Sequence, residues 1–125
     1  AASANRRFDN VREEDLNDFI YSMDSENTKK QIKYGMSVFG EFCKEVEASF
    51  DDIDGEGLDL LLSQFYAGAR NKKGELYSKK SMQAIRFALQ RHFLNTRGLD
   101  IVKGKEFTRS NRAFKAVLVK LKTSG

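Results

Sequence analysis

Proline and tryptophan are absent from this sequence of 125 residues, and cysteine and histidine occur only once each. Because proline interrupts helices, and because Ala, Leu, Lys, Glu and Gln are well represented, the composition favours an all-α fold. The single cysteine, Cys43, excludes an internal disulfide framework and fits a reducing compartment. One cysteine and one histidine do not make a zinc constellation.

Long apolar runs are also missing. No run approaches the roughly 20 residues that a membrane span requires, and the N-terminal stretch AASANRRFDN lacks the apolar core of a signal peptide. We therefore expect an intracellular protein with no membrane partner. The hydrophobic content of 40%, which includes ten phenylalanines, is sufficient for a globular core, and the length is that of one domain.

Charge is divided unequally along the chain. Residues 1–65 contain 15 acidic and 7 basic residues, a balance of −8, whereas residues 66–125 contain 3 acidic and 15 basic residues, a balance of +12. The stretch RNKKGELYSKKSMQAIRFALQRHF, residues 70–93, has seven Lys or Arg against Glu75 alone. Such asymmetry favours a surface that faces a polyanion in the second half of the chain.

Apolar residues recur at helical spacing in five segments. The second segment has the clearest stripe, and the fourth has both a main apolar face and a second strip formed by Phe87 and Leu94. Asp24, Ser25 or Asn27 can cap the second helix, Ser78 or the preceding turn the fourth, and Thr108 or Ser110 the last. The two main stripes are Ile32, Met36, Phe39, Cys43 and Val46, and Met82, Ile85, Ala88, Leu89, His92 and Phe93.

These patterns predict a compact all-α bundle of four to five helices. A helix that is apolar on two sides, as the fourth is, usually lies at the centre of a bundle. Residues 1–10 are expected to form a flexible N-terminus, and residues 11–125 a single helical domain. The predicted helices are about 12–23, a second helix after residues 24–27, and then 57–70, 78–96 and 109–122.

No segment completes a catalytic or metal-binding motif. DDIDGEGLDLLLS resembles the start of an EF-hand loop, but Ser63 stands where the loop needs a bidentate Glu, so an acidic turn that caps the third helix is the better interpretation. His92 falls on an apolar face, which is typical of a core or boundary histidine. No phosphate-binding loop motif is present. We expect no cofactor, no metal and no catalysis by this chain alone.

The order of these features resembles a known family. TKKQIKYGMSVFGEFCKE is similar to the first long helix of the core-binding, SAM-like N-terminal domain of tyrosine recombinases and integrases, which ends in F-x-x-F, here Phe39 and Phe42. GLDLLLSQFYAGARNKKGELYSKKSMQAIRFALQRHFL resembles the next two helices of that domain. More narrowly, GELYSKKSMQAIRFALQRHF, RGLDI and EFTRSNRAFKAVLVKLKTSG resemble Crypton-type recombinases and host proteins descended from them. The resemblance covers about residues 25–125.

The resemblance implies the DNA-binding half of a recombinase. The family's Arg-rich active site and tyrosine nucleophile belong to a second domain, and His92 here is not part of the H-x-x-R motif found there. A non-catalytic domain that grips double-stranded DNA, and hence a nuclear location, is therefore implied, with the acids of residues 51–59 facing away from the DNA. The implied DNA-facing residues are Thr28, Lys29, Lys30, Lys33, Ser37, Lys72, Lys73, Ser78, Lys79, Lys80, Gln83, Arg86 and Gln90.

Within that set, the chemistry of the side chains suggests a division of roles. Lysines supply phosphate contacts, which position a protein on DNA without reading its sequence. Gln83, Arg86 and Gln90 are the candidates for base edges in the major groove, because Arg suits guanine and Gln suits adenine. The alternative is a protein–protein interaction module derived from a domesticated recombinase, in which the charged face meets an acidic partner or a second copy of the chain.

Overall fold

The computed structural model describes residues 7–22 and 25–124, and every regular element within them is helical. The all-α bundle predicted from the sequence is confirmed, as are its helices to within about three residues at the ends that are described. The predicted end of the first helix at Met23, the cap candidate Asp24 and residues 1–6 of the predicted flexible N-terminus lie outside the described residues. In chain order the elements are α1 Glu13–Ser22, α2 Glu26–Glu45, α3 Gly55–Gly68, α4 Lys79–Arg97, the 3-10 helix η2 Lys105–Phe107 and α5 Thr108–Ser124.

Three helix starts are fixed by local caps. The Ser25 hydroxyl accepts a hydrogen bond from the backbone N–H of Thr28 at 3.1 Å, and Ser78 does the same for α4, as predicted. The Asp54 carboxylate accepts from the N–H of Gly57 at 2.7 Å, so the acidic turn caps α3. Because Asp54 is the cap, α3 begins at Gly55 rather than at residue 57.

The first turn of α5 is capped from another helix. The buried carboxylate of Asp59 on α3, only 6% exposed, accepts a hydrogen bond from the backbone N–H of Ser110 at 2.9 Å. The predicted local caps act differently: the Thr108 hydroxyl donates backward to the carbonyl of Lys105, and the Ser110 hydroxyl to that of Phe107. Asp59 thereby ties α3 to the start of α5.

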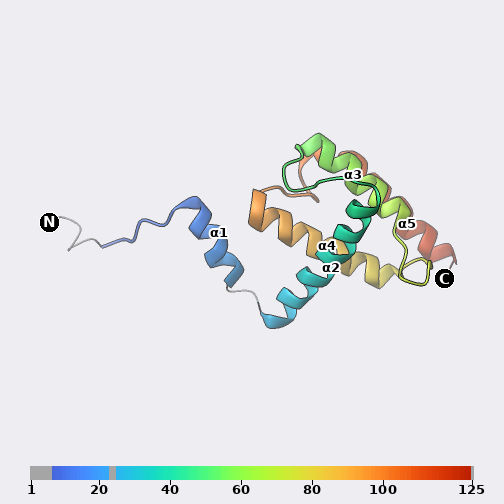
Figure 1. The fold of residues 1–125 in the computed structure, drawn as a ribbon, viewed down its shortest axis with the longest axis horizontal. Coiled ribbons are helices and arrows are strands. Elements are labelled where there is room, and N and C mark those ends of the chain that lie inside the picture. Colours follow the sequence, from blue (N-terminus) through green and yellow to red (C-terminus); the bar gives the residue numbers. More distant parts are fainter. Residues whose placement is uncertain (1–6, 23–24, 125) are drawn as a thin grey trace.

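The bundle consists of two packed pairs of helices. Figure 1 shows α2 crossing α4 and α3 running beside α5, and these two pairs make the most extensive contacts between elements. At the crossing Gly35 of α2 lies against Ala88 of α4, so closely that a Cβ on Gly35 would overlap the Cβ of Ala88. Gly98, with φ at +66°, ends α4 in the left-handed conformation that glycine tolerates best.

Phenylalanine rings fill the centre of the core. Phe39 is fully buried, and its ring lies 5.2 Å from that of Phe65, 5.3 Å from that of Phe50 and 6.1 Å from that of Phe93, measured between centroids. Aromatic pairs in tilted or edge-to-face geometry stabilise a core beyond the area they bury. Val46, predicted to extend the α2 stripe inward, is instead half exposed at the C-terminal cap of α2.

Two apolar surfaces are left uncovered. The second strip of α4 does not pack into the core as a central helix would require, because Phe87 is 44% exposed and Leu94 is 38% exposed. On α1, which contacts α4, Leu16 is 44% exposed and Phe19 is 61% exposed. Among the described residues, no helix is long and apolar enough to cross a membrane.

Candidate nucleic-acid interface

The outward side of α2 carries the first group of predicted contact residues. Lys30, Lys33 and Ser37 are exposed. They follow one another by three and four positions, the spacing that places side chains on the same side of a helix. This side of α2 therefore presents two ammonium groups and one hydroxyl in a row to solvent.

The two predicted residues nearest the start of α2 have partners within the helix. The Thr28 hydroxyl accepts a hydrogen bond from the Ser25 hydroxyl at 3.0 Å as part of the N-terminal cap. The Lys29 ammonium lies 3.6 Å from the carboxylate of Glu26. Both residues thus take part in the local structure of the helix start, and we leave them out of the proposed interface.

The basic turn between α3 and α4 is held in place by Asn71. Its side-chain oxygen accepts hydrogen bonds from the backbone N–H groups of Lys73 at 2.9 Å and Glu75 at 3.0 Å. Its own backbone N–H donates to the carbonyl of Glu75, and its carbonyl accepts from Gly74. This network presents Lys72 and Lys73 at an ordered, exposed tip, so Asn71 is a positioning residue for both lysines.

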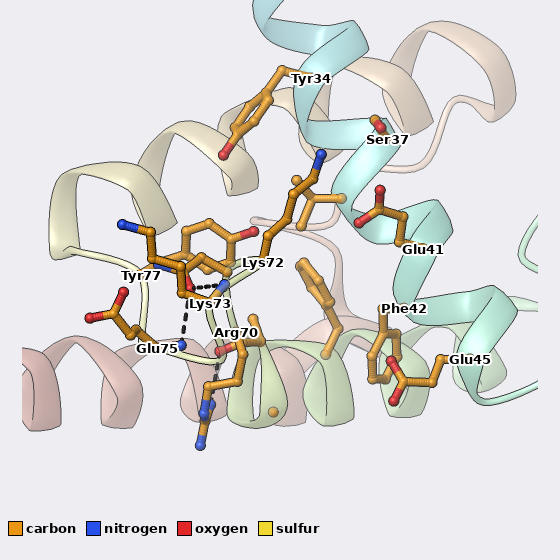
Figure 2. Close-up of a pocket in the computed structure, with 15 residues that line it drawn as sticks. Tyr34, Ser37, Glu41, Phe42, Glu45, Arg70, Lys72, Lys73, Glu75 and Tyr77 are labelled. Atoms are coloured by element: carbon orange, nitrogen blue, oxygen red, sulfur yellow. Dashed lines mark hydrogen bonds between the residues drawn. The ribbon is translucent and has the colours of Figure 1, made fainter.

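The turn and α2 enclose an open groove of about 720 Å³, which we call the α2–turn groove. Figure 2 shows Lys72 extended from the turn toward Tyr34 and Ser37 of α2. The groove therefore joins two segments of the predicted DNA-facing set that lie more than 30 residues apart. It is lined by Tyr34, Ser37, Val38, Glu41, Phe42, Glu45, Phe65, Gly68, Ala69, Arg70, Asn71, Lys72, Lys73, Glu75 and Tyr77.

The electrostatics of this groove are mixed. Glu41 and Glu45 form its α2 wall opposite the basic turn, and Glu75 lies in the turn itself. Burial raises the pKa of Tyr77, and the neighbouring Tyr34, whose hydroxyl shares a hydrogen bond with that of Tyr77, raises it further. The glutamates would repel phosphate along the inner wall, so a polyanion is best placed at the side of the groove formed by Lys72 and Lys73.

The start of α4 adds two exposed lysines shortly after the basic turn. The Ser78 cap is followed directly by Lys79 and Lys80, both exposed, and the first turn contains no acidic residue. The first turn of a helix carries the positive end of the helix dipole, so lysines here add to a positive potential that already attracts anions. The segment from Lys72 to Lys80 thus offers four ammonium groups and a helix N-terminus to solvent.

Arg86, by contrast, is built into the packing of α4 against α5. Its guanidinium donates to the side-chain oxygen of Asn111 and lies 4.3 Å over the ring of Phe114. Burial raises the pKa of Tyr66 to about 12, although a hydrogen bond and the charge of Arg86 act in the opposite direction. Arg86 therefore joins three helices and is not directed toward the α2–turn groove.

Gln90 and Gln83 also belong to the α5 side of α4. The side-chain N–H of Gln90 donates to the carboxylate of Asp100 at 3.1 Å, and Gln83, though exposed, lines the same space beside α5. The structure does not bring these two residues or Arg86 together with the lysines of α2 and the turn. We therefore leave all three predicted base-edge residues out of the proposed interface.

The acids of residues 51–59 lie away from the α2–turn groove, and none of them lines it. Asp54 and Asp59 cap helices, and Asp52 accepts a hydrogen bond from the Ser49 hydroxyl. Asp54 and Asp59 line a different depression, between the starts of α3 and α5. The acids of residues 51–59 thus lie outside the groove, whereas Glu41 and Glu45, which also belong to the acidic half of the chain, line it.

His92 packs at the edge of the core, as its place on an apolar face predicted. Its ring lies 6.4 Å from that of Phe50 and 5.2 Å from that of Phe93, between centroids. Burial lowers the pKa of His92 below its usual value, and the negative charge of Asp51 only partly opposes this. Burial likewise raises the pKa of the Cys43 thiol to about 11, so this thiol stays protonated at neutral pH.

The lowered pKa of His92 predicts a pH-dependent stability. A folded-state pKa below the unfolded value of 6.5 means that the unfolded chain binds the proton more tightly, so the free energy of unfolding falls as the pH drops below about 6.5. Urea unfolding at pH 7.5, 6.5 and 5.5 measures this fall. His92→Gln should flatten the dependence, and an equal fall in both proteins would show that another group is responsible.

Within the described part of the chain, no three His, Cys, Asp or Glu side chains gather closely enough to hold a metal ion. Comparisons of the chain with family models, with curated protein sequences and with solved structures gave no match. The resemblance to the recombinase core-binding domain thus rests on the sequence motifs described above.

Proposed function

We propose that this chain binds double-stranded DNA through its phosphates, as a non-catalytic module resembling the N-terminal clamp half of a tyrosine recombinase. The observation that carries the proposal is that Ser37 of α2 lines one groove together with Lys72 and Lys73 of the basic turn. Lys30 and Lys33 are exposed on α2 before Ser37 and line a neighbouring depression with His92. The acids of residues 51–59 lie elsewhere. Ser78 is left out for the same reason as Thr28, because its hydroxyl caps α4. The proposed contact residues are Lys30, Lys33, Ser37, Lys72, Lys73, Lys79 and Lys80.

Lysines on this face suit phosphate more than bases. A lysine ammonium is a compact charge without the planar fork that reads guanine, and it binds phosphate in any sequence. Arg86 and Gln90, which have the chemistry to read bases, already hold Asn111 and Asp100. We therefore expect little sequence preference and an affinity in the micromolar range or weaker, as for non-specific binding.

The position of the lysines also supports a functional origin. Cations in the first turn of a helix oppose the helix dipole, which costs about 0.3–1 kcal/mol each. Lys79 and Lys80 occupy the first turn of α4. Stability alone would favour acidic residues at both positions, so a selective advantage of another kind is needed, and anion binding supplies one.

Because these lysines favour anion binding but oppose the helix dipole, Lys79→Glu/Lys80→Glu should weaken DNA binding while it stabilises the fold. Affinity for a labelled duplex at about 0.1 M salt should fall by at least about tenfold, because two phosphate contacts are replaced by repulsion. The free energy of unfolding should rise by about 1 kcal/mol, because acidic residues now meet the positive end of the helix dipole. Fluorescence anisotropy and urea unfolding of the same protein measure the two effects.

Lys103→Glu/Lys105→Glu is the matched control, because both lysines are exposed, lie outside the proposed face and undergo the same change of charge. Its affinity for DNA should stay within about threefold of the parent protein. Equal losses in the two variants would mean that net charge, rather than this face, governs the interaction, and the proposal would fail.

The protein-interaction alternative is favoured by one observation of its own. Apolar side chains of α1 and α4 that the bundle leaves exposed, among them Phe19 and Phe87, have no role in phosphate binding. Exposed apolar groups flanked by charge are typical of protein contact surfaces. They are compatible with the DNA-binding proposal because neither residue lines the α2–turn groove.

A further inference from the structure

A second groove lies between α4 and α5 and has an apolar lining. It measures about 380 Å³, and we call it the α4–α5 groove. Phe87 and Leu94, the exposed strip of α4, form one wall, and Leu118 of α5 faces them. The full lining is Gln83, Arg86, Phe87, Gln90, Arg91, Leu94, Val102, Phe114 and Leu118.

The charge around this groove is positive. Among the described residues that line it are two arginines and no acid. Lys115 is exposed and precedes Leu118 by three positions on α5, so it adds a cation on the same side of the helix. Asp100, which lies next to the groove floor, already accepts hydrogen bonds from Gln90 and from the backbone N–H groups of Val102 and Lys103.

Two buried polar atoms lie beside this groove, the side-chain oxygen of Gln90 and the Nε of Arg86, and neither has a hydrogen-bond partner in the described chain. Both atoms are fully buried, so a segment docked in the groove does not reach them. The features that favour a ligand are therefore the apolar wall and the positive rim. The groove suits a segment with apolar side chains and negative charge around them.

The helix α1 has these properties. Its sequence EEDLNDFIYS contains four acidic residues and no basic one. Leu16 and Phe19 are exposed on it, and Phe8 and Val11 are exposed just before it. Figure 1 shows α1 standing at one end of the bundle, where a neighbouring molecule can approach it.

We propose that α1 of one copy of this chain docks in the α4–α5 groove of a second copy. Phe19 and Leu16 would fill the apolar lining, while Glu13 and Asp15 of α1 would face Arg91 and Lys115 at the rim. The docking helix and the groove that receives it are different parts of the chain. The contact is therefore head-to-tail and continues into rings or open chains. A helix of ten residues buries less area than a standard interface, so a dissociation constant on the order of tens of micromolar at low salt is expected.

A pair of complementary variants tests this contact directly. Phe19→Asp disrupts the docking helix α1, and Phe87→Asp disrupts the α4–α5 groove that receives it. Both positions are exposed, so both variants should fold, which circular dichroism checks. Sedimentation equilibrium at protein concentrations up to about 0.5 mM should show an average mass that rises with concentration for the parent chain. Each variant alone should remain a monomer, because its dissociation constant for self-association rises at least about tenfold. An equimolar mixture of the two variants should form a one-to-one dimer and no larger species. Only α1 of the Phe87→Asp chain and the α4–α5 groove of the Phe19→Asp chain remain intact in it.

Val119→Asp is the control, since Val119 is an exposed apolar residue of α5 that does not line the groove. It should associate like the parent chain. A parent chain that stays monomeric throughout, variants that still associate, or a mixture that remains monomeric would each overturn the proposal. None of these results depends on DNA, so they do not bear on the proposed function.

Discussion

Replacement of Lys30, Lys33, Lys72 and Lys73 by glutamate should lower the affinity for duplex DNA by at least about 10³-fold at about 0.1 M salt. These four lysines supply most of the phosphate contacts proposed for the α2 and turn segments. Each contact removed forgoes the release of about one counterion, and the introduced carboxylates add repulsion. Fluorescence anisotropy with two duplexes of unrelated sequence measures the loss, which should be the same for both.

The control for this variant reverses four other exposed cations, Lys103, Lys105, Arg112 and Lys115, so that the total change in charge is equal. Its affinity should fall by less than about tenfold, through the long-range change in net charge alone. If both variants lost the same affinity, the lysines of α2 and the turn would have no special place in the interaction. If the first variant bound DNA as the parent chain does, the proposed face would be wrong.

The second large effect concerns the crossing that holds α2 against α4. Gly35→Ala should lower the free energy of unfolding by about 2 kcal/mol, because an added methyl in a tightly packed contact forces the helices apart. The new Cβ would overlap that of Ala88 and lie 3.3 Å from the carbonyl oxygen of Ile85. Urea unfolding measures the change. DNA affinity should also fall, since the crossing sets the position of α2 relative to the turn.

Gly40→Ala in the same helix provides the opposite result. Nothing lies within 4 Å of a Cβ placed there, so the higher helix propensity of alanine should stabilise the protein by up to about 1 kcal/mol. Ala88→Gly added to Gly35→Ala should recover part of the loss by removing the methyl that the new one meets. Equal effects at the two glycines, or no recovery, would show that the close contact does not limit the approach of α2 and α4.

The helices of this fold could be predicted from the sequence because their signals are local. Spacing of apolar residues by three and four placed α2 to α5, and Ser25 and Ser78 were identifiable as caps because the cap and its amide partner are three residues apart. The cap of α5 could not be predicted in this way. Asp59 and Ser110 are 51 residues apart and meet only once α3 lies beside α5.

The candidate site was predictable in composition but not in arrangement. The sequence showed which cations lie on the open sides of α2 and α4, since a 3.6-residue period separates them from the core. It did not show which neighbouring helix covers each side. Arg86 and Gln90 appeared to extend the row begun by Lys79, yet α5 and the preceding connector occupy that side and hold both residues through Asn111 and Asp100.

The exposed apolar strip of α4 could likewise be predicted in composition but not in its packing. Phe87 and Leu94 lie seven positions apart, a spacing that predicts burial against a neighbour but does not identify the neighbour. Within this chain α5 covers only one border of that strip, and Phe87 remains 44% exposed. The acidic α1 of a second copy, as proposed above, is the complement that this surface lacks.

The salt dependence of DNA binding tests the central claim most directly. With about six phosphate contacts, the logarithm of the binding constant should fall with the logarithm of salt concentration at a slope near −5 for the parent chain. The variant with glutamate at positions 30, 33, 72 and 73 should show a slope near −2, because about two contacts remain. A parent slope near zero, or an unchanged slope in the variant, would contradict the account.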